Sequence, residues 1–184
     1  MSGQRVLVVI PAHNEEDSLP RTLAEVRASA PQVDILVVDD GSRDGTREVA
    51  RAAGVPVVRH PINLGVGGAL QTGFRYAIQH GYDIGVQLDA DGQHDPVWLE
   101  ALLAPVRNGQ CDVSIGSRYV ARSGYRAPLT RRLGMLLFSG VVRLALGRNI
   151  ADTRSGFRAY SRSVMQVCQF DFPKDFPDAP LLIL

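Results

Sequence analysis

The stretch Val86–Pro96 reads V-Q-L-D-A-D-G-Q-H-D-P, and the rest of the chain is interpreted around it. The short apolar run from Ile84 to Leu88 ends in two carboxylates one residue apart, Asp89 and Asp91. Residues i and i+2 of an extended chain point to the same side, so both carboxylates can face one point in space. Adjacent carboxylates repel unless a cation lies between them, and such hard oxygen ligands suit Mg²⁺ or Mn²⁺. The stretch therefore predicts a strand that ends at a metal site, with an ordinary polar turn as the alternative.

The composition is that of an ordinary globular protein. The chain has 184 residues, of which 45% are hydrophobic and 21% charged, so we expect one domain with a buried core. The net charge of +1 gives no reason to expect a nucleic-acid partner. Cys111 and Cys168 lie far apart without metal-type spacing, which fits a reduced, cytoplasmic compartment. The sequence shows neither a signal-peptide pattern nor the roughly 20 uninterrupted apolar residues that span a bilayer.

Apolar runs alternate with helix-like segments from Val6 to Gly116. Strands are expected at Val6–Ile10, which Pro11 would end, and at Ile35–Val38, Val55–Arg59, Ile84–Leu88 and Asp112–Gly116. Helices are expected at about Glu15–Ser29 with His13 or Asn14 as its cap, then at Arg43–Ala53, Ala69–His80 and Pro96–Arg107. Strands that are almost wholly apolar and alternate with helices predict an α/β fold, with a mostly parallel central sheet and helices on both faces.

Polar clusters follow four of these five strands. They read P-A-H-N-E, D-D-G-S, D-A-D-G-Q-H and G-S-R in chain order. Because parallel sheets place their sites at the carboxyl ends of the strands, the clusters predict one shared crevice. A nucleotide diphosphate with a metal fits these groups. The candidates are Asp39 or Asp40 and Glu15 for the base or ribose, Asp91 with Gln93 for the metal, and Arg118 for a phosphate.

The glycine-rich stretch Gly65–Gly68 only superficially matches a dinucleotide-binding loop. That loop reads G-x-G-x-x-G directly after the first strand, whereas here Leu70 stands at the third glycine position and the stretch follows the third strand. We interpret it as a turn, within Asn63–Gly68, that leads into a helix. Contact between its amides and a phosphate remains an alternative.

Five motifs, in this order and spacing, closely resemble glycosyltransferase family 2. They are V-I-P-A-H-N-E, V-V-D-D-G-S-x-D-G-T, N-x-G-x-G-x-A-x-x-x-G, D-A-D-G-Q-H-x-P and I-G-S-R-Y. The resemblance runs from Val6 to about Tyr160 and is greatest to the polyprenyl-phosphate or dolichyl-phosphate sugar transferases. It implies a GT-A-type nucleotide-diphospho-sugar transferase fold, expected here as a single domain over 1–184. It also implies an inverting hexosyltransferase that moves a sugar from a GDP- or UDP-sugar, with a polyprenyl phosphate as the preferred acceptor.

The same resemblance implies roles for individual residues. The nucleoside would be held by Pro11, His13, Glu15, Val38 and Asp40, and the diphosphate, sugar and metal by Asp89, Ala90, Asp91 and Gln93. Asp91 and Gln93 are expected to ligate Mg²⁺ or Mn²⁺, and Asp89 to face the sugar and ribose. Asp89, Asp91 and Arg118 form the expected catalytic set. The family often has an aromatic residue where this chain has His13, and a histidine ring can still stack on a base or ribose.

The acceptor phosphate has four candidate partners, namely Arg118, Arg131, Arg154 and Arg158. The last two belong to D-T-R-S-G-F-R-A-Y at 152–160, which is similar to a family segment that returns a strand to the site. A lipid phosphate is already an anion and needs no general base, whereas a saccharide hydroxyl does. Asp175 and Asp178 could supply that base, but Ala179 and Pro180 follow them where relatives tend to show a second acidic residue.

The segment 129–147 carries an apolar face at helical spacing between basic residues. Such a helix either lies in a membrane interface, making the protein peripheral on the cytoplasmic face, or packs on the sheet as core. The apolar run Leu181–Leu184 begins what should be a helix, so we expect a truncated C-terminus. Two further readings stay open, transfer to a saccharide hydroxyl and a non-catalytic nucleotide-binding or membrane-associated scaffold. The motifs are compatible with guanine or uracil as the base, and they do not determine the oligomeric state.

Overall fold

Six strands form one sheet within residues 3–92, 94–116, 155–170 and 172, the part of the chain that the computed structural model describes. The strand order is β3-β2-β1-β4-β6-β5. Pairs β1–β2, β1–β4 and β2–β3 are parallel, whereas β6 runs antiparallel to both β4 and β5. The mostly parallel sheet expected from the sequence is confirmed. The strands are β1 Val6–Ala12, β2 Asp34–Asp39, β3 Val57–Arg59, β4 Ile84–Leu88, β5 Val113–Ile115 and β6 Phe157–Ser161.

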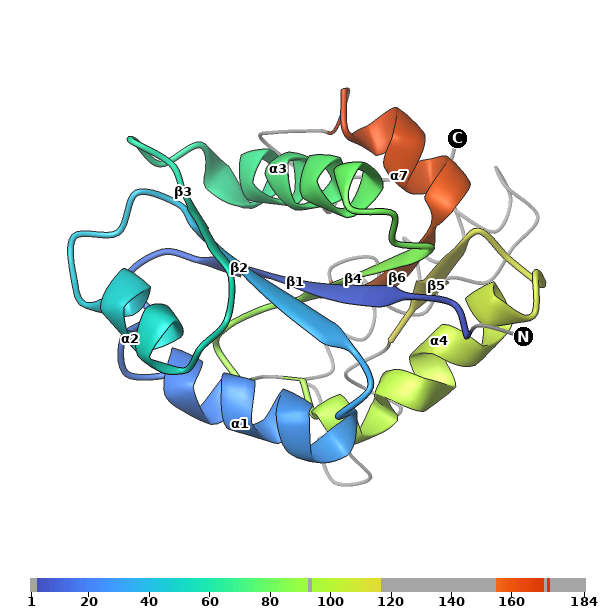
Figure 1. The fold of residues 1–184 in the computed structure, drawn as a ribbon, viewed down its shortest axis with the longest axis horizontal. Helices are drawn as coiled ribbons and strands as arrows, with labels where there is room; N and C mark the ends of the chain where they lie inside the picture. Colours follow the sequence, from blue (N-terminus) through green and yellow to red (C-terminus); the bar gives the residue numbers. More distant parts are fainter. Residues whose placement is uncertain (1–2, 93, 117–154, 171, 173–184) are drawn as a thin grey trace, which may run out of the picture.

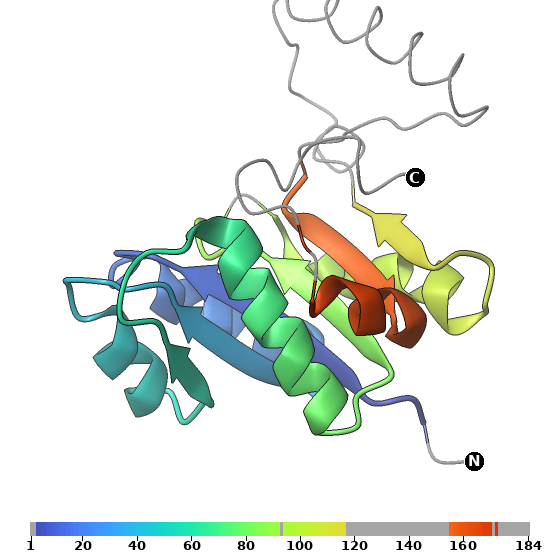
Figure 2. The same cartoon turned by 90° about the horizontal axis from the view of Figure 1, so that it is seen from above.

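Helices cover both faces of this sheet, with α3 and α7 on one side and α1, α2 and α4 on the other (Figure 1). Figure 2 shows α3 and α7 lying side by side over the strands. The helices are α1 Leu19–Ser29, α2 Thr46–Ala52, α3 Gly65–Gln79, α4 Leu99–Arg107 and α7 Arg162–Cys168, with a single 3₁₀ turn, η1 Pro96–Trp98, directly before α4.

Strand β1 shows why its sequence is apolar without alternation. Val8 and Ile10 pack with the residues of α1 and α4, whereas Leu7 and Val9 pack with those of α3 and α7. In a strand that is buried on both faces, a polar side chain would lose its hydration on either side. Helix α3 approaches β1 so closely that a Cβ on Gly73 would lie 2.3 Å from Val9 Cγ1.

Pro11 does not end the first strand, contrary to the expectation from the sequence. Strand β1 continues to Ala12, and Pro11 pairs in register with Val38 of β2. The pairing of β1 with β4 stops at Val9, so Pro11 lies where β1 has only one neighbouring strand. A residue without an N–H is tolerated where one side of the strand makes no ladder.

Helix boundaries also differ from those expected. Helix α1 begins at Leu19 with Ser18 as its N-cap, rather than at Glu15 after His13 or Asn14. Helix α2 covers Thr46–Ala52 rather than Arg43–Ala53. Helix α3 begins at Gly65, so the glycines interpreted as a turn form its first turn. The remaining elements lie within a few residues of their expected bounds. Cys168 is buried and Cys111 half-buried.

The segment at 152–160 contains the expected returning strand, because β6 occupies Phe157–Ser161. It inserts between β4 and β5, an order that the sequence does not predict. In the described ranges no helix is both long and apolar enough to cross a membrane. The predicted interfacial helix at 129–147 and the C-terminal run 181–184 lie outside the described residues.

Candidate active site

The carboxyl ends of β1, β2 and β4 lie at one edge of the sheet, since these three strands are adjacent and parallel. Three loops start there, with residues 13–18 after β1, 40–45 after β2 and 89–95 after β4. These loops hold most of the residues predicted to bind the donor. The topology therefore brings to one edge groups that are separated by up to about half of the chain.

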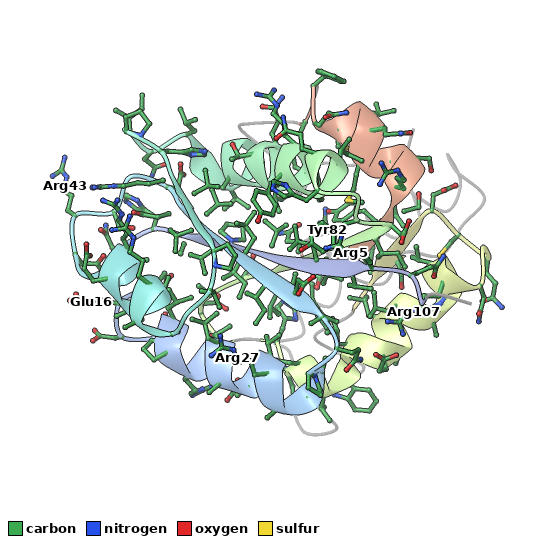
Figure 3. All side chains as sticks on the ribbon, viewed as in Figure 1. Arg5, Glu16, Arg27, Arg43, Tyr82 and Arg107 are labelled. Atoms are coloured by element: carbon green, nitrogen blue, oxygen red, sulfur yellow. The ribbon has the colours of Figure 1, made fainter. Side chains whose placement is uncertain are left out.

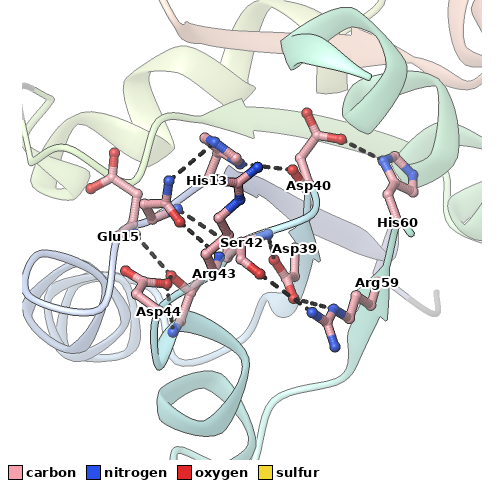
Figure 4. A network of polar contacts seen from close by, with 11 residues as sticks. His13, Glu15, Asp39, Asp40, Ser42, Arg43, Asp44, Arg59 and His60 are labelled. Atoms are coloured by element: carbon pink, nitrogen blue, oxygen red, sulfur yellow. Dashed lines mark hydrogen bonds and ion pairs between the residues drawn. The ribbon is translucent and has the colours of Figure 1, made fainter. Parts of the chain in front are cut away.

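The loops after β1 and β2 are joined by hydrogen bonds (Figure 4). The Asn14 amide donates to Ser42 Oγ at 3.0 Å, and Asn14 Oδ1 accepts from the Arg43 amide at 2.9 Å. The Glu15 amide donates to Thr46 Oγ1 at 2.8 Å. Asn14 has a positive φ of 56°, a conformation that asparagine tolerates better than most residues. Ser42 of the second loop and Thr46, the first residue of α2, thus accept from the amides of two residues that the sequence had placed at the start of a helix.

Asp44 completes this junction. It accepts from the Thr46 hydroxyl at 2.5 Å, from the Thr46 amide at 3.1 Å and from the Glu16 amide at 3.1 Å. Desolvation is the largest single influence and raises the pKa of Asp44. The hydrogen bonds from Thr46 and Glu16 together outweigh it and lower that pKa below its ordinary value of 3.8.

The residues predicted to hold the nucleoside gather on β1, β2 and the loops that follow. Pro11 and Val38 are buried register partners. His13 is exposed, and its Nδ1 lies 2.8 Å from the backbone carbonyl oxygen of Asp40. Glu15 is half-buried, and its carboxylate accepts from the Ser18 hydroxyl. The structure thus places His13 against Asp40. The sequence had assigned both residues to the nucleoside without predicting a contact between them.

Each of Asp39 and Asp40 has one carboxylate oxygen that accepts no hydrogen bond from the described residues, but that of Asp39 is buried against Arg59. Asp39 Oδ1 accepts from the Ser42 amide at 2.9 Å, and its Oδ2 lies 3.3 Å from Arg59 Nε. Asp40 Oδ1 accepts from His60 Nδ1 at 2.6 Å and from the Leu64 amide at 2.9 Å. No described residue bonds Asp40 Oδ2, which points away from His60 in Figure 4.

His60 was missed by the sequence analysis. It directly follows β3, the one strand end whose polar residue was not counted with the other four. Its side chain is buried, and its second ring nitrogen lies 2.9 Å from Thr72 Oγ1 of α3. The rule that sites gather at the carboxyl ends of strands would have found it.

The D-A-D loop is held from two sides. Asp89 is half-buried, Ala90 buried and Asp91 exposed. The backbone carbonyl of Ala90 accepts from Thr22 Oγ1 of α1 at 3.0 Å. Further on, Asp95 accepts from the Val97 amide at 3.0 Å and so caps η1. The exposed carboxylate of Asp91 is therefore carried by a loop that is anchored before and after it.

Asp89 lies against Gly156, the residue directly before strand β6. A Cβ on Gly156 would lie 1.6 Å from Asp89 Oδ2, so the carboxylate occupies the space that glycine leaves open. On its other side Gln87 Nε2 donates to Asp89 Oδ1 at 3.4 Å, and Tyr160 Oη donates to Gln87 Oε1 at 3.2 Å. Burial is the main cause that raises the pKa of Tyr160 to about 12, so its hydroxyl stays a donor at neutral pH.

The two carboxylates fit a divalent cation shared with a ligand. Mg²⁺ and Mn²⁺ take oxygen ligands, and Mg²⁺ is usually held by one or two carboxylates together with substrate phosphates and water. Asp89 and Asp91 supply that number at the end of β4. Among the described residues no group of three His, Cys, Asp or Glu side chains could enclose a metal alone. Gln93, the other predicted ligand, lies outside the described residues.

Of the four arginines predicted to meet the acceptor, only Arg158 falls within the described residues. It lies on β6 in register with Gln87 and is 4% exposed. Its positive charge acts on the Tyr160 hydroxyl and partly offsets the effect of burial on the pKa of that group. Arg118, Arg131 and Arg154 remain predictions from the sequence.

Comparison with known proteins agrees with this architecture. The family model described as Glycosyl transferase family 2 matches residues 7–168. Undecaprenyl-phosphate mannosyltransferase of Micrococcus luteus is 41% identical over 173 residues, which cover 91% of this chain and 70% of the relative. Polyprenol monophosphomannose synthase of Mycolicibacterium smegmatis is 41% identical over 170 residues, which cover 89% of this chain and 64% of the relative.

Solved structures share the fold. Glucosyl-3-phosphoglycerate synthase from Mycobacterium tuberculosis in complex with uridine diphosphate has a TM-score of 0.67 and 28% identity, over 89% of this chain and 58% of that one. A complex of the same enzyme with Mn²⁺, UDP-glucose and phosphoglyceric acid has a TM-score of 0.66 at 26% identity. The chain thus spans between 58% and 70% of the length of these proteins. Because the family model covers most of the chain and the expected GT-A-type sheet is present, this chain belongs to glycosyl transferase family 2.

Proposed function

We propose that the chain transfers a sugar, with inversion, from a GDP- or UDP-sugar to a polyprenyl phosphate, with Mg²⁺ or Mn²⁺ at the donor diphosphate. The observation that carries this proposal is the meeting of the β1, β2 and β4 ends, which brings Asp40, Asp89 and Asp91 to one sheet edge. The polyprenyl-phosphate acceptor is inferred from relatives at 41% identity whose names specify it. Mn²⁺ is inferred from the solved complex with UDP-glucose.

Each residue has a distinct role in this proposal. His13 and Asp40 bind the nucleoside beside Pro11, Glu15 and Val38. Asp91, with Gln93, holds the metal, which when bound neutralises the negative charge of the leaving diphosphate. Asp89, fixed over Gly156, faces the sugar. Positioning and electrostatic stabilisation of this kind account for much of the rate enhancement in group transfer.

The acceptor side needs no general base if the acceptor is a phosphate, because a phosphate oxygen is already a nucleophile. Arg118, Arg131, Arg154 and Arg158 are the candidates for binding it. One of the solved complexes contains phosphoglyceric acid, which carries both a phosphate and a hydroxyl group, so this small molecule is the alternative acceptor to test. For a lipid phosphate the protein would work at the cytoplasmic surface of a membrane, with the segment 129–147 as the predicted contact.

Donor binding is tested first, by thermal shift with GDP, UDP and their sugars, with and without Mn²⁺. A ligand that binds only the folded state raises the melting temperature by mass action, so one of the nucleotides should stabilise the protein more when Mn²⁺ is present. Asp91→Ala should remove the metal-dependent part of the shift. Asp95→Asn is the matched control, since it changes a carboxylate of the same loop that caps η1. Metal-dependent stabilisation that survives in Asp91→Ala would refute the site assignment.

Transfer is tested second, by incubating the protein with the nucleotide-sugar that stabilises it and a short polyprenyl phosphate. A glycolipid product of inverted anomeric configuration is expected. 3-Phosphoglycerate and a saccharide should be poor acceptors in the same assay. If product forms only with 3-phosphoglycerate or only with a saccharide, that compound is the acceptor and the lipid assignment is wrong. Nucleotide binding without any product would favour the non-catalytic scaffold.

A further inference from the structure

His60, which follows β3, and Asp40, which follows β2, form a buried pair at the proposed donor site. The proposed function assigns no role to His60. His60 is 6% exposed and Asp40 3% exposed. His60 Nδ1 lies 2.6 Å from Asp40 Oδ1, and a carboxylate that only accepts requires the proton to be on that nitrogen. His60 Nε2 lies 2.9 Å from Thr72 Oγ1, which fixes the other side of the ring. Both ring nitrogens are thus held, so the imidazole has one orientation.

Asp40 Oδ1 is occupied by a second donor as well. The amide of Leu64, the N-cap residue of α3, donates to it at 2.9 Å, so the carboxylate also lies at the positive end of that helix. The loop that carries Leu64 packs tightly on the loop after β2, because a Cβ on Gly41 would lie 2.7 Å from the Ile62 carbonyl carbon. Gly41 has a positive φ of 71°, a conformation suited to glycine.

The consequence is a carboxylate with two different oxygens. Oδ1 takes two donors from the protein, whereas Oδ2 takes none from the described residues. A half-turn about the Cβ–Cγ bond only exchanges two equivalent oxygens, whereas any intermediate rotation breaks both bonds, and hydrogen bonds to a charged group in a buried site are costly to lose. Oδ2 is therefore presented as a fixed acceptor for one N–H or O–H group.

We propose that His60 is a positioning residue for donor recognition, which turns Asp40 so that Oδ2 accepts a single N–H or O–H of the donor nucleoside. Thr72 holds the other side of the His60 ring and makes no hydrogen bond with Asp40 itself. The inference rests on the proposed function, because it takes Asp40 as a nucleoside-binding residue. It adds a residue from the third strand end to a site otherwise built from the first, second and fourth.

Two substitutions of His60 separate its two contacts. In His60→Asn the side-chain amide nitrogen can occupy the place of Nδ1, so the bond to Asp40 is kept and the contact with Thr72 is lost. In His60→Gln the longer amide reaches the place of Nε2, so the contact with Thr72 is kept and the bond to Asp40 is lost. His60→Leu removes both. The dissociation constant of UDP or GDP, whichever binds more tightly with Mn²⁺, is measured by calorimetry.

We expect His60→Gln and His60→Leu to weaken nucleotide binding about tenfold, and His60→Asn and Thr72→Val by less than about threefold. His80→Gln is the matched control, because the ring of His80 is exposed directly after α3, where it bonds the carbonyl of Tyr76 and stacks on the Tyr76 ring. Turnover should follow the same order through the KM for the donor, with kcat little changed. Equal weakening in His60→Asn and His60→Gln, or unchanged binding in His60→Leu, would overturn the inference.

Asp40→Asn separates this inference from the proposed function. If Asp40→Asn binds nucleotide as tightly as the original chain, the donor assignment itself fails. If Asp40→Asn weakens binding and His60→Leu does not, only the positioning role fails. Nitrogen NMR of the imidazole in the unchanged protein gives a test that needs no variant to fold. A proton on Nδ1 is expected, and a ring protonated only on Nε2 would refute the contact with Asp40.

Discussion

Asp89 shows how one residue of the D-A-D motif depends on a distant segment. Its carboxylate fills the space over Gly156, and Gln87 links it to the buried hydroxyl of Tyr160. Two of these three neighbours, Gly156 and Tyr160, belong to the segment 152–160, for which the sequence predicted a strand returning to the site and two arginines for the acceptor, but no contact with Asp89. Strand β6 and the glycine before it therefore shape the surroundings of Asp89 as well as extending the sheet.

Gly156→Ala should lower kcat by at least about tenfold, because the added methyl group would lie 1.6 Å from Asp89 Oδ2 and must displace the carboxylate. Initial rates and the dissociation constant of the Mn²⁺–nucleotide complex are measured together. Gly85→Ala in β4 is the control, since its Cβ would meet Met165 Sδ at 2.4 Å, away from Asp89. It should lower the melting temperature without a comparable loss of kcat. A Gly156→Ala enzyme with normal kcat would show that the position of Asp89 does not matter.

Asp44 makes the junction between the loops after β1 and β2 sensitive to acid. Its pKa is lowered in the folded protein, so its ionised form stabilises the fold above the ordinary value of 3.8, and this contribution is lost as the pH falls through the folded-state pKa. Asp44→Asn should therefore reduce the fall in melting temperature between about pH 6 and pH 3. Asp17→Asn is the control, because Asp17 lies exposed in the neighbouring turn. An unchanged pH profile in Asp44→Asn would contradict the assigned hydrogen bonds.

Helix α3 can lie close to β1 because residue 73 of the helix is glycine. The contact between Gly73 and Val9 brings the helix against the central strand of the sheet. Elsewhere in a helix, replacing glycine by alanine stabilises a protein by about 0.5–1 kcal/mol. Here the methyl group would lie 2.3 Å from Val9 Cγ1, and overpacking of a core costs about 1–3 kcal/mol.

Gly73→Ala should therefore reverse the usual sign and lower the free energy of unfolding by about 1–2 kcal/mol. Urea denaturation measures this directly. Val9→Ala in the same chain should recover part of the loss that Gly73→Ala causes, because it removes the methyl groups that the new Cβ meets. A Gly73→Ala protein as stable as the original would mean that α3 can move away from β1 at little cost.

The elements that the sequence predicted well are those decided by burial. Strand β4 has the expected bounds, Ile84–Leu88, because an apolar run that ends abruptly in carboxylates has one reading. The predicted start of α1 was wrong because the amides of Asn14 and Glu15 bond side chains in the loop after β2 and at the first residue of α2. That choice between a local helix and a distant partner depends on tertiary structure, as does the insertion of β6 between β4 and β5.

Arg5 and Tyr82, which are distant in the sequence, are in contact at the opposite edge of the sheet. The Arg5 guanidinium lies 4.3 Å from the centre of the Tyr82 ring (Figure 3). Burial and then the hydrogen bond from its hydroxyl to Asp34 raise the pKa of Tyr82 to about 12. This end of the sheet is closed by contacts within the protein, whereas at the other edge Asp40 Oδ2 accepts no hydrogen bond from the described residues and the Asp91 carboxylate is exposed.

For the molecule as a whole, one topological rule allowed the sequence to predict which edge of the sheet the candidate residues share. Polar residues after parallel strands meet at one edge, and this placed Asp40 and Asp91 without any coordinates. Neither the rule nor the motifs gave the partners that orient those residues. His60 and Gly156 reach the site only through the packing of β3 beside β2 and of β6 beside β4. Long-range packing of this kind leaves no local pattern in the sequence.

The same topology predicts how binding spreads through the protein. A nucleotide with Mn²⁺ should slow amide hydrogen exchange in three separate segments at once, 12–18, 39–46 and 89–95, because the three loops would share one ligand. Segment 60–64 should be protected as well if His60 and the Leu64 amide hold Asp40. The opposite edge, around Arg5, Asp34 and Tyr82, is the internal control and should exchange at an unchanged rate. Exchange measured by mass spectrometry with Mn²⁺ alone separates metal binding from nucleotide binding. Protection confined to one loop, or found at the opposite edge, would contradict a donor site shared among β1, β2 and β4.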